Sequence, residues 1–245
     1  MNVLTSLGRI VTSLGNISFG TVKRNPNNMC ALLHDVSVPT KKATFAMGCF
    51  WGPDSLFGAM RGVVRTRVGY TGGSKKNPTY KSIGDHTEAI DIDFDPEQTS
   101  FEELLSVFWA NHDPSSSYSQ QYTSLILYHN AEQKELAEKM LKEEERKKGK
   151  VFVTKVLPFK EFYDGEDYHQ KYRLQQHSWL MEAVGLKPGP QLKTSHLAAR
   201  LNGHVVGFGG VAQFESEVER LGLDEKTAEY VRKLVTKFEG RGMTC

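Results

Sequence analysis

The residues TFAMGCFWGPDSLFGAM, at positions 44–60, pass from a strand pattern to a helix pattern within a few positions. Thr44–Met47 is a short apolar run that stops at a glycine, which predicts a buried strand. In Phe50–Met60 the apolar side chains recur at helical spacing. Pro53 fits the first turn of this helix, because the N–H that proline lacks has no partner there. The stretch therefore predicts a strand that leads directly into a helix, with Cys49 at the junction.

The segments that follow continue the alternation of strands and helices. Val63–Tyr70 is rich in β-branched residues, and Glu88–Phe94 alternates apolar and polar residues, which predicts a half-buried strand. The motif Ser-Phe-Glu-Glu at 100–103 is a capping box that opens a helix. Thr123–Tyr128 is a further strand. This order, β-α-β-β-α-β, predicts an α+β fold with a ferredoxin-like split β-α-β core.

The rest of the chain adds helices to this core. Asn130 is expected to cap a long charged helix over 131–148, and Val151–Leu157 predicts a fifth strand. Asp167–Gln176 and 191–238 have helical patterns, and the second ends in an amphipathic helix. We therefore divide the chain into an N-terminal leader at 1–40, a folded body at 41–172 and a helical C-terminal extension at 173–245.

The composition argues against two classes of partner. The chain has 245 residues, of which 24% are charged, and a formal net charge of +2. No apolar run approaches the roughly 18 to 20 residues that a membrane helix needs. No basic stripe exists outside the N-terminal segment, so the electrostatic footprint of a nucleic-acid-binding protein is missing. We expect neither a membrane nor a nucleic acid as partner.

The N-terminal segment has a composition of its own. Residues 1–34 contain no Asp or Glu and carry Arg9, Lys23 and Arg24. The segment is rich in Ser and Thr and loosely amphipathic, so it resembles a mitochondrial transit peptide, with a leader that has no targeting role as the alternative. Met29 offers an internal start that would omit this leader. The expected location is mitochondrial, cytoplasmic or both.

The three cysteines, Cys30, Cys49 and Cys245, are too few for a disulfide-stabilised secreted domain. A cysteine that matters here is therefore expected to act through its reactivity in a reducing compartment. The predicted position of Cys49, between a strand and the N-terminus of a helix, favours the nucleophilic thiolate. The alternative is a small buried apolar side chain. The eight histidines form no cluster with metal-ligand spacing, so we expect no metal site.

Six blocks of sequence carry a family resemblance. In chain order they are Gly48-Cys49-Phe50-Trp51-Gly52; Gly69-Tyr70-Thr71-Gly72-Gly73 with Asn77-Pro78-Thr79-Tyr80; His86-Thr87-Glu88-Ala89; Phe108-Trp109-Ala110-Asn111-His112-Asp113-Pro114; Gln121-Tyr122-Thr123-Ser124; and Phe162-Tyr163 with Glu166-Asp167-Tyr168-His169-Gln170. Their order and content resemble the type A peptide methionine sulfoxide reductase family. The resemblance makes 41–172 the catalytic domain.

The resemblance implies a role for several residues. Cys49 would be the nucleophile that attacks the sulfoxide sulfur and becomes a sulfenic acid. Glu88 would be the general acid that protonates the sulfoxide oxygen. Tyr80 and Tyr122 would hydrogen-bond that oxygen. Phe50 and Trp51 would be the walls that hold the substrate methyl group. The substrate would be methionine S-sulfoxide, free or in oxidised proteins and peptides.

The resemblance also implies how the enzyme is regenerated. No prosthetic group is expected, because electrons would come from an external thiol, with thioredoxin as the partner. Family members often have resolving cysteines in a Gly-rich C-terminal tail. Here residues 191–240 replace that tail, and Cys245, the only cysteine downstream of the last block, is the expected resolving residue. Cys30 is the lesser alternative, and direct reduction by an external thiol is the third route. We expect a monomer.

Two loops depart from the family pattern. Tyr80 and Glu88 are only eight positions apart, and Ser115–Gln120 replaces a longer segment. An acidic residue that the family often has in this second loop has no counterpart.

The same residues allow two other functions. The first is a cysteine acyl-transfer hydrolase, in which Cys49 would pair with His86, His112 or His169. The second is a redox-sensing or thioredoxin-binding module without turnover. Two roles are expected for the C-terminal extension as alternatives: it covers the core, or it contacts a partner.

Overall fold

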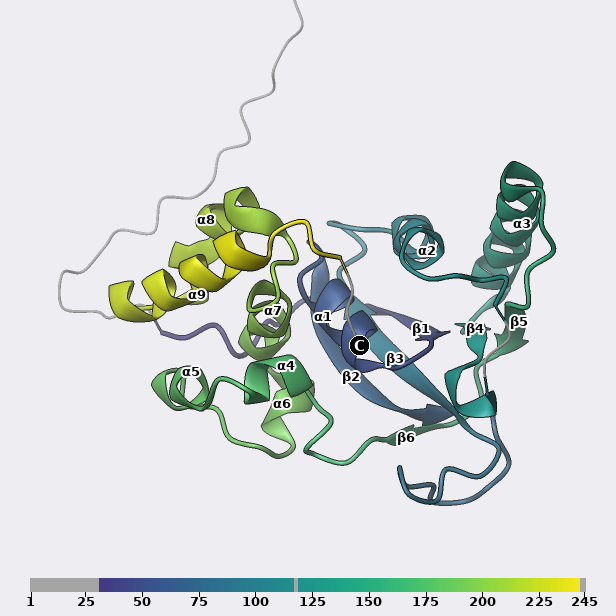
Figure 1. The fold of residues 1–245 in the computed structure, drawn as a ribbon, viewed down its shortest axis with the longest axis horizontal. Helices are drawn as coiled ribbons and strands as arrows, with labels where there is room; N and C mark the ends of the chain where they lie inside the picture. The colour runs from purple at the N-terminus through teal and green to yellow at the C-terminus, as the bar shows by residue number, and fades with distance from the viewer. Residues whose placement is uncertain (1–30, 117–118, 243–245) are drawn as a thin grey trace, which may run out of the picture.

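The computed structural model describes residues 31–116 and 119–242. Within them one six-stranded sheet forms in the order β5-β4-β1-β3-β2-β6 (Figure 1). The strands are β1 (Lys41–Met47), β2 (Val63–Thr71), β3 (Thr87–Phe94), β4 (Ser124–Tyr128), β5 (Lys155–Pro158) and β6 (Phe162–Asp164). The helices are α1 (Trp51–Gly58), α2 (Phe101–Ala110), the 3-10 helix at Gln120–Tyr122, α3 (Ala131–Lys148), α4 (Tyr172–Gln175), α5 (Ser178–Ala183), α6 (Gln191–Thr194), α7 (His196–His204), α8 (Gly210–Leu221) and α9 (Glu225–Phe238).

The four central strands have the predicted ferredoxin-like arrangement. β3 lies between β1 and β2 and pairs antiparallel with both, while β4 pairs antiparallel with the other side of β1. α1 connects β1 to β2, and α2 connects β3 to β4, which is the split β-α-β order. β5 and β6 extend the sheet at its two edges. The α+β fold with a helical C-terminal part is therefore confirmed.

Helices α1 and α2 pack against one face of the sheet. The Phe45 ring of β1 has its centroid 5.6 Å from that of Phe57 on α1 and 5.2 Å from that of Phe108 on α2. All three side chains are fully buried. Burial of an aromatic ring contributes about 1.5 to 3 kcal/mol. The apolar positions of the strand and the helix at the start of the domain thus meet in one core.

Two helix starts that the sequence predicts from capping residues are confirmed. Ser100 accepts a hydrogen bond from the Glu103 N–H at 3.1 Å, and the Glu103 carboxylate accepts one from the Ser100 N–H at 2.8 Å. Asn130 accepts a hydrogen bond from the Gln133 N–H at 2.9 Å and opens α3 at Ala131, as predicted. The caps satisfy N–H groups that have no partner inside the helix.

β3 was predicted to be half-buried, and that prediction is wrong. Asp91, on the face expected to meet solvent, is 2% exposed. Its carboxylate accepts hydrogen bonds from Lys42 and Thr44 on β1 and from Arg67 on β2. Burial would raise the pKa of Asp91, but the charges of Lys42 and Arg67 hold it below its usual value. Cross-strand partners therefore replace solvent on this face.

The segment around residues 151–176 also differs from the prediction. The fifth strand begins at Lys155 and not at Val151, because the Val153 N–H bonds to the Pro114 carbonyl oxygen at 2.8 Å instead of joining the sheet. The three-residue strand β6 was not predicted. The helix expected at Asp167–Gln176 is reduced to α4, because Lys171 is left-handed, with φ of +53°, and interrupts it.

Helices α4 to α9 form a second apolar cluster beside α1, away from α3 (Figure 1). Residues before β1 belong to this cluster: the Leu33 N–H bonds to the Leu221 carbonyl oxygen, and the Leu33 and His34 carbonyl oxygens accept from the first N–H groups of α7. The expected leader boundary at residue 40 thus falls within folded chain, and residues 1–30 lie outside the described part. Among the described helices, none has the length and hydropathy of a membrane-spanning segment.

A buried ion pair fixes α1 from one side. The Lys171 Nζ lies 2.9 Å from the Asp54 carboxylate of α1, and both side chains are at most 1% exposed. Asp54 also accepts hydrogen bonds from the Lys171 N–H at 3.0 Å and from the Thr66 hydroxyl of β2 at 2.6 Å. Breaking a buried pair by removing one partner typically costs about 3 to 5 kcal/mol. This pair therefore joins α1, β2 and the turn before α4.

Candidate active site

Cys49 lies in the turn between β1 and α1. The residue before it, Gly48, has φ of +84°, a left-handed conformation that favours glycine and lets the chain turn sharply out of the strand. Cys49 itself is half-buried. Phe50 is the N-cap of α1 and provides no side-chain cap, so the backbone N–H groups of the first turn need other partners. The placement that the sequence predicts for Cys49, before a helix N-terminus, is the one observed.

Glu88 of β3 meets the same helix end. Its Oε2 accepts a hydrogen bond from the Phe50 N–H at 3.1 Å, and its Oε1 accepts one from the Gln121 side chain at 2.7 Å. The side chain is 1% exposed. Burial raises the pKa of Glu88 above its usual value, against the lowering effect of these two hydrogen bonds. A carboxyl with a raised pKa can donate a proton nearer to neutral pH than an exposed one.

The two tyrosines predicted for the site lie together beside this carboxyl. Burial raises the pKa of Tyr122, and the charge of Glu88, a hydrogen bond with Tyr80 and the nearby Cys49 add to that effect. Tyr80 is 39% exposed and stands at the rim, where its N–H donates to the Glu166 carboxylate at 2.9 Å. The structure therefore brings together four of the predicted residues: Cys49, Glu88, Tyr80 and Tyr122.

Phe50 and Trp51 occupy different depths. Phe50 is 1% exposed and packs against Tyr70, with ring centroids 6.0 Å apart. Trp51 is half-buried, and its ring stacks on Tyr172 of α4 at 3.8 Å with a 7° angle between the planes. Trp51 and Tyr172 thus form a half-buried aromatic stack near Cys49 in the chain, while Phe50 belongs to the buried interior.

His169 lies at the centre of the site, although the sequence predicts no role for it in reduction. Its Nδ1 accepts a hydrogen bond from the Trp51 indole N–H at 3.2 Å, and its ring lies 5.1 Å from Phe50 and 4.8 Å from Tyr80. It is 2% exposed, and burial lowers its pKa, which favours the neutral ring. Gln121 was missed in the same way. Both residues belong to the sequence blocks that carry the family resemblance, and this membership was the signal that could have identified them.

The structure does not supply the general base of an acyl-transfer hydrolase. His112 bonds to the Phe108 carbonyl oxygen and to the Ser124 hydroxyl, at 2.7 and 2.8 Å. His86 bonds to the Lys75 carbonyl oxygen at 2.6 Å and accepts from a backbone N–H through its other nitrogen. These contacts occupy both ring nitrogens of each of these two histidines. His169 accepts from Trp51 through Nδ1, so its neutral ring carries the proton on Nε2, which has no hydrogen-bond partner among the described residues and no lone pair to act as a base.

Hydrogen bonds to an aspartate stabilise part of each of the two altered loops. The Asp85 carboxylate accepts from the Ser74 hydroxyl and from the Ser74 and Lys75 N–H groups, and these bonds lower its pKa to about 2. In the second loop Asp113 accepts from the Ser115 N–H and hydroxyl, at 2.9 and 2.7 Å. Each short loop therefore has an aspartate as its own anchor.

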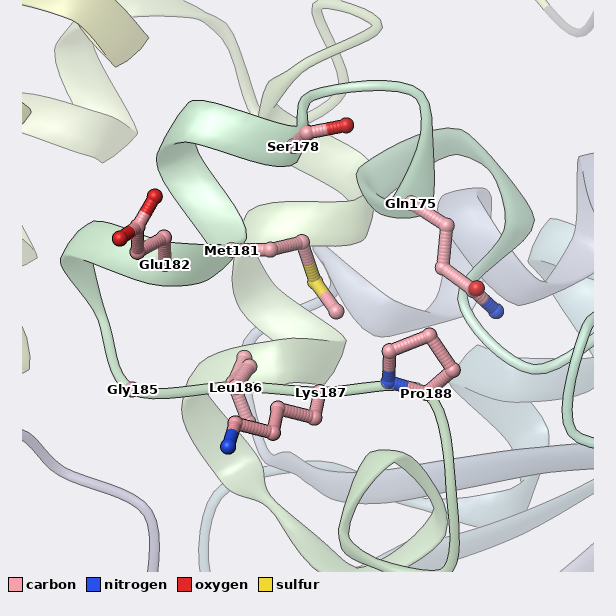
Figure 2. Close-up of a pocket in the computed structure, with 8 residues that line it drawn as sticks. All are labelled: Gln175, Ser178, Met181, Glu182, Gly185, Leu186, Lys187 and Pro188. Carbon is pink, nitrogen blue, oxygen red and sulfur yellow. The ribbon is translucent and has the colours of Figure 1, made fainter.

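The other cysteines lie outside the described residues, and the other cavity considered lies away from Cys49. Cys30 and Cys245 lie outside the described residues. Within those residues, no group of three His, Cys, Asp or Glu side chains could hold a metal ion. A separate pocket of about 360 Å³ lies beside α5, where the Met181 side chain is directed toward Pro188 (Figure 2). It contains neither Cys49 nor Glu88.

Comparisons with known proteins agree with the geometry. A family profile described as peptide methionine sulfoxide reductase matches residues 41–198, and one described as the helical domain of selenoprotein methionine sulfoxide reductase A matches residues 188–236. A Drosophila melanogaster peptide methionine sulfoxide reductase is 48% identical over 216 residues, which is 87% of this chain and 87% of that one. A relative of the same description from Methanosarcina acetivorans is 46% identical over 146 residues, or 54% of this chain and 77% of its own.

Two solved structures are also similar. Methionine sulfoxide reductase A of Corynebacterium diphtheriae is 28% identical, with a TM-score of 0.53, and the match covers 64% of this chain and 88% of that one. Reduced Mxr1 of Saccharomyces cerevisiae is 30% identical, also with a TM-score of 0.53, over 56% of this chain and 86% of that one.

The raised pKa of Glu88 predicts a pH-dependent effect of Glu88→Gln on stability. Below the unfolded-state pKa the carboxyl is neutral in both states, so its ionisation has no effect on folding. As the pH rises through the folded-state pKa, the buried carboxylate comes to oppose folding. The melting temperature of the Gln variant, relative to the native protein, should therefore rise between about pH 3.5 and pH 8.

Glu215 on α8 provides a control with the opposite sign. Its hydrogen bond with Arg232 lowers its pKa, so Glu215→Gln should lose stability relative to the native protein as the pH rises. A melting-temperature difference for Glu88→Gln that stays constant with pH, or that falls, would contradict the assignment.

Proposed function

The chain belongs to the peptide methionine sulfoxide reductase family, and we propose that it reduces the S epimer of methionine sulfoxide, free or in proteins, with electrons from thiols. The observation that carries the proposal is the contact at the start of α1. The Phe50 N–H and the Gln121 amide hold Glu88, a buried carboxyl with a raised pKa, next to the turn that carries Cys49. A nucleophile and a proton donor therefore converge on one point.

The first step uses both groups. The Cys49 thiolate attacks the sulfoxide sulfur while Glu88 gives its proton to the sulfoxide oxygen, which is a poor leaving group until it is protonated. The bond between the Cys49 sulfur and the substrate sulfur and the sulfoxide's sulfur–oxygen bond then break as the protonated oxygen moves to the Cys49 sulfur. Cys49 becomes a sulfenic acid, and methionine leaves with the electron pair. Glu88 then takes a proton from solvent. The N-terminus of α1 supports the step, because its partial positive charge favours the thiolate.

The surrounding side chains orient the substrate. The Tyr122 side chain is near the Glu88 charge and hydrogen-bonds with Tyr80, which suits the two hydroxyls to hydrogen-bond the polarised sulfoxide oxygen. Trp51, stacked on Tyr172, offers an apolar face to the substrate methyl group. Because the oxygen and the methyl group of the pyramidal sulfur would each be held while Cys49 attacks from a fixed side, this arrangement favours one epimer, and separate enzymes act on the two epimers.

Regeneration needs a second thiol. The thiol of Cys245 attacks the sulfur of the sulfenic acid, water leaves, and the resulting disulfide is reduced by the two thiols of thioredoxin. α9 ends beside Gly207, close to the C-terminal end of α1. The chain turns directly after α9, where the Arg241 N–H bonds to the Phe238 carbonyl oxygen, and α1 is only about 12 Å long. This nearness of α9 to α1 supports Cys245 as the resolving residue. Cys30 and a direct attack by thioredoxin are the other routes.

The remaining parts of the proposal concern the cellular setting. The reaction uses no prosthetic group, since each electron pair passes through sulfur. We propose that the enzyme acts as a monomer on oxidised proteins, peptides and free methionine sulfoxide. The acid-free segment 1–34 supports delivery to the mitochondrion, with a start at Met29 as the route to a cytoplasmic form.

The function is tested with the separate sulfoxide epimers. The native protein with dithiothreitol should form methionine from the S epimer only, and Cys49→Ser should form none. Cys30→Ser is the matched cysteine control and should keep the native rate. Absence of turnover on both epimers by folded native protein, with Cys49 still oxidisable, would indicate a redox sensor and overturn the proposal.

Cys245→Ser separates the routes of regeneration. Dithiothreitol reduces a sulfenic acid directly, so turnover with this reductant should stay within about twofold of the native rate, while thioredoxin-driven turnover should fall by about tenfold or more. Steady-state rates with both reductants provide the comparison. Unchanged turnover with thioredoxin would show that Cys245 is not the resolving residue.

A further inference from the structure

The C-terminal end of α1 receives its hydrogen-bond donors from the helical extension. The Nη1 of Arg200 on α7 donates to the Gly58 carbonyl oxygen at 3.1 Å and to the Met60 carbonyl oxygen at 2.7 Å. The Gln213 side chain on α8 donates to the Ala59 carbonyl oxygen at 2.6 Å. The last carbonyl groups of a helix have no partner within it. Two side chains from outside the catalytic domain therefore bond to three successive carbonyls at this end, of which that of Met60 also accepts from the Val63 N–H at 3.2 Å.

The backbones of α1 and α7 approach closely at the same place. A Cβ atom at Gly203 of α7 would lie 2.4 Å from the Ala59 Cβ and 2.5 Å from the Ser55 carbonyl oxygen. A Cβ atom at Gly58 would lie 2.4 Å from the Ala199 carbonyl oxygen. Because backbone is present on both sides of these contacts, α1 cannot move against α7 without a loss of packing.

Arg200 is itself held in place. It is 2% exposed, and its Nη2 bonds to both carboxylate oxygens of Glu217, at 2.8 and 2.9 Å. His204, fully buried, contacts the same carboxylate through Nε2 and the Phe208 carbonyl oxygen through Nδ1. Burial would raise the pKa of Glu217, but its bond with His204 and the charge of Arg200 lower it to about 2. A two-point bond to a carboxylate fixes the plane of a guanidinium.

The opposite end of α1 carries the chemistry. α1 has eight residues, so its ends are about 12 Å apart. Cys49 and the Phe50 N–H that binds Glu88 belong to the N-terminal end. A helix of two turns moves as a unit, so a shift of its C-terminal end also shifts its N-terminal end. A displacement of reacting groups by 1 Å can lower the rate by about a hundredfold.

We propose that Arg200, fixed by Glu217 and His204, is a positioning residue for the reductase step: it anchors the C-terminal end of α1 and thereby sets Cys49 and the Phe50 N–H against Glu88. The proposal rests on the function proposed above. It gives the helical extension a part in catalysis without any contact with substrate.

The test uses the full chain with substitutions at two anchors. Arg200→Met keeps the apolar stem and removes all donors, Arg200→Lys keeps the charge but not the planar fork, and Gln213→Ala removes the second anchor. Arg232→Met is the matched control, because Arg232 also pairs with a glutamate of α8 but on the surface and away from α1. Circular dichroism and melting curves confirm that each variant is folded at the assay temperature.

Turnover of the S epimer with dithiothreitol is the first measurement. Arg200→Met should lower kcat by about 10- to 100-fold with KM within about threefold of the native value, because the alignment of reacting groups is lost and the aromatic stack is kept. Arg200→Lys should give an intermediate rate, Gln213→Ala a decrease of about threefold, and Arg232→Met a native rate. A folded Arg200→Met protein with native kcat would overturn the proposal.

The pH dependence of Cys49 alkylation is the second measurement, and it needs no turnover. Peptide mapping by mass spectrometry isolates Cys49 from the other cysteines. Arg200→Met should shift the midpoint of the alkylation profile, which a loss of stability without displacement of α1 would leave unchanged. If Arg200→Met does not fold, Arg200→Lys decides with the same two measurements, and native values in both would overturn the proposal.

The two proposals can fail separately. A native protein that reduces neither epimer removes the reductase function, but the alkylation profile still shows whether Arg200 sets the environment of Cys49. A native protein that reduces the S epimer, together with unchanged kcat and alkylation in folded Arg200→Met, removes only the role of Arg200.

Discussion

The hydrogen bond from the Phe50 N–H to the Glu88 carboxyl is the contact on which the site depends. It joins the first turn of α1 to the middle strand of the ferredoxin-like core, and it places a buried acid beside the residue that precedes that turn, Cys49. An acid at this position gains a raised pKa from burial, while the helix N-terminus favours a thiolate in Cys49. One contact therefore relates the proposed proton donor to the proposed nucleophile.

The geometry of that contact depends on the position of α1. The helix has no side-chain cap at its N-terminus, so its position comes from contacts along its length and at its C-terminus. The buried Asp54–Lys171 pair fixes its middle to β2 and to the turn before α4. Arg200 and Gln213 fix its far end to the helical extension. The extension thus supports the catalytic domain, instead of being a separate appendage.

Local signals in the sequence predicted most of the central fold, and long-range contacts account for the differences. The caps at Ser100 and Asn130 use residues three positions away, so they can be recognised from spacing alone. The burial of Asp91 depends on Lys42 and Arg67 from two other strands, which periodicity does not reveal. The roles of Cys49 and Glu88 came from the motif blocks. The sequence did not predict the burial or the contacts of Arg200, because an arginine in a helical pattern is normally a surface residue.

The central claim is that Glu88 donates a proton while Cys49 attacks, and single-turnover kinetics across pH test it most directly. The rate of methionine formation from the S epimer should fall as the pH rises through the raised pKa of Glu88, because the proton donor is lost. Glu88→Gln should be slower by about a hundredfold or more and should lack that decline. A Gln variant with the native rate, or with the same decline as the native protein, would contradict the account.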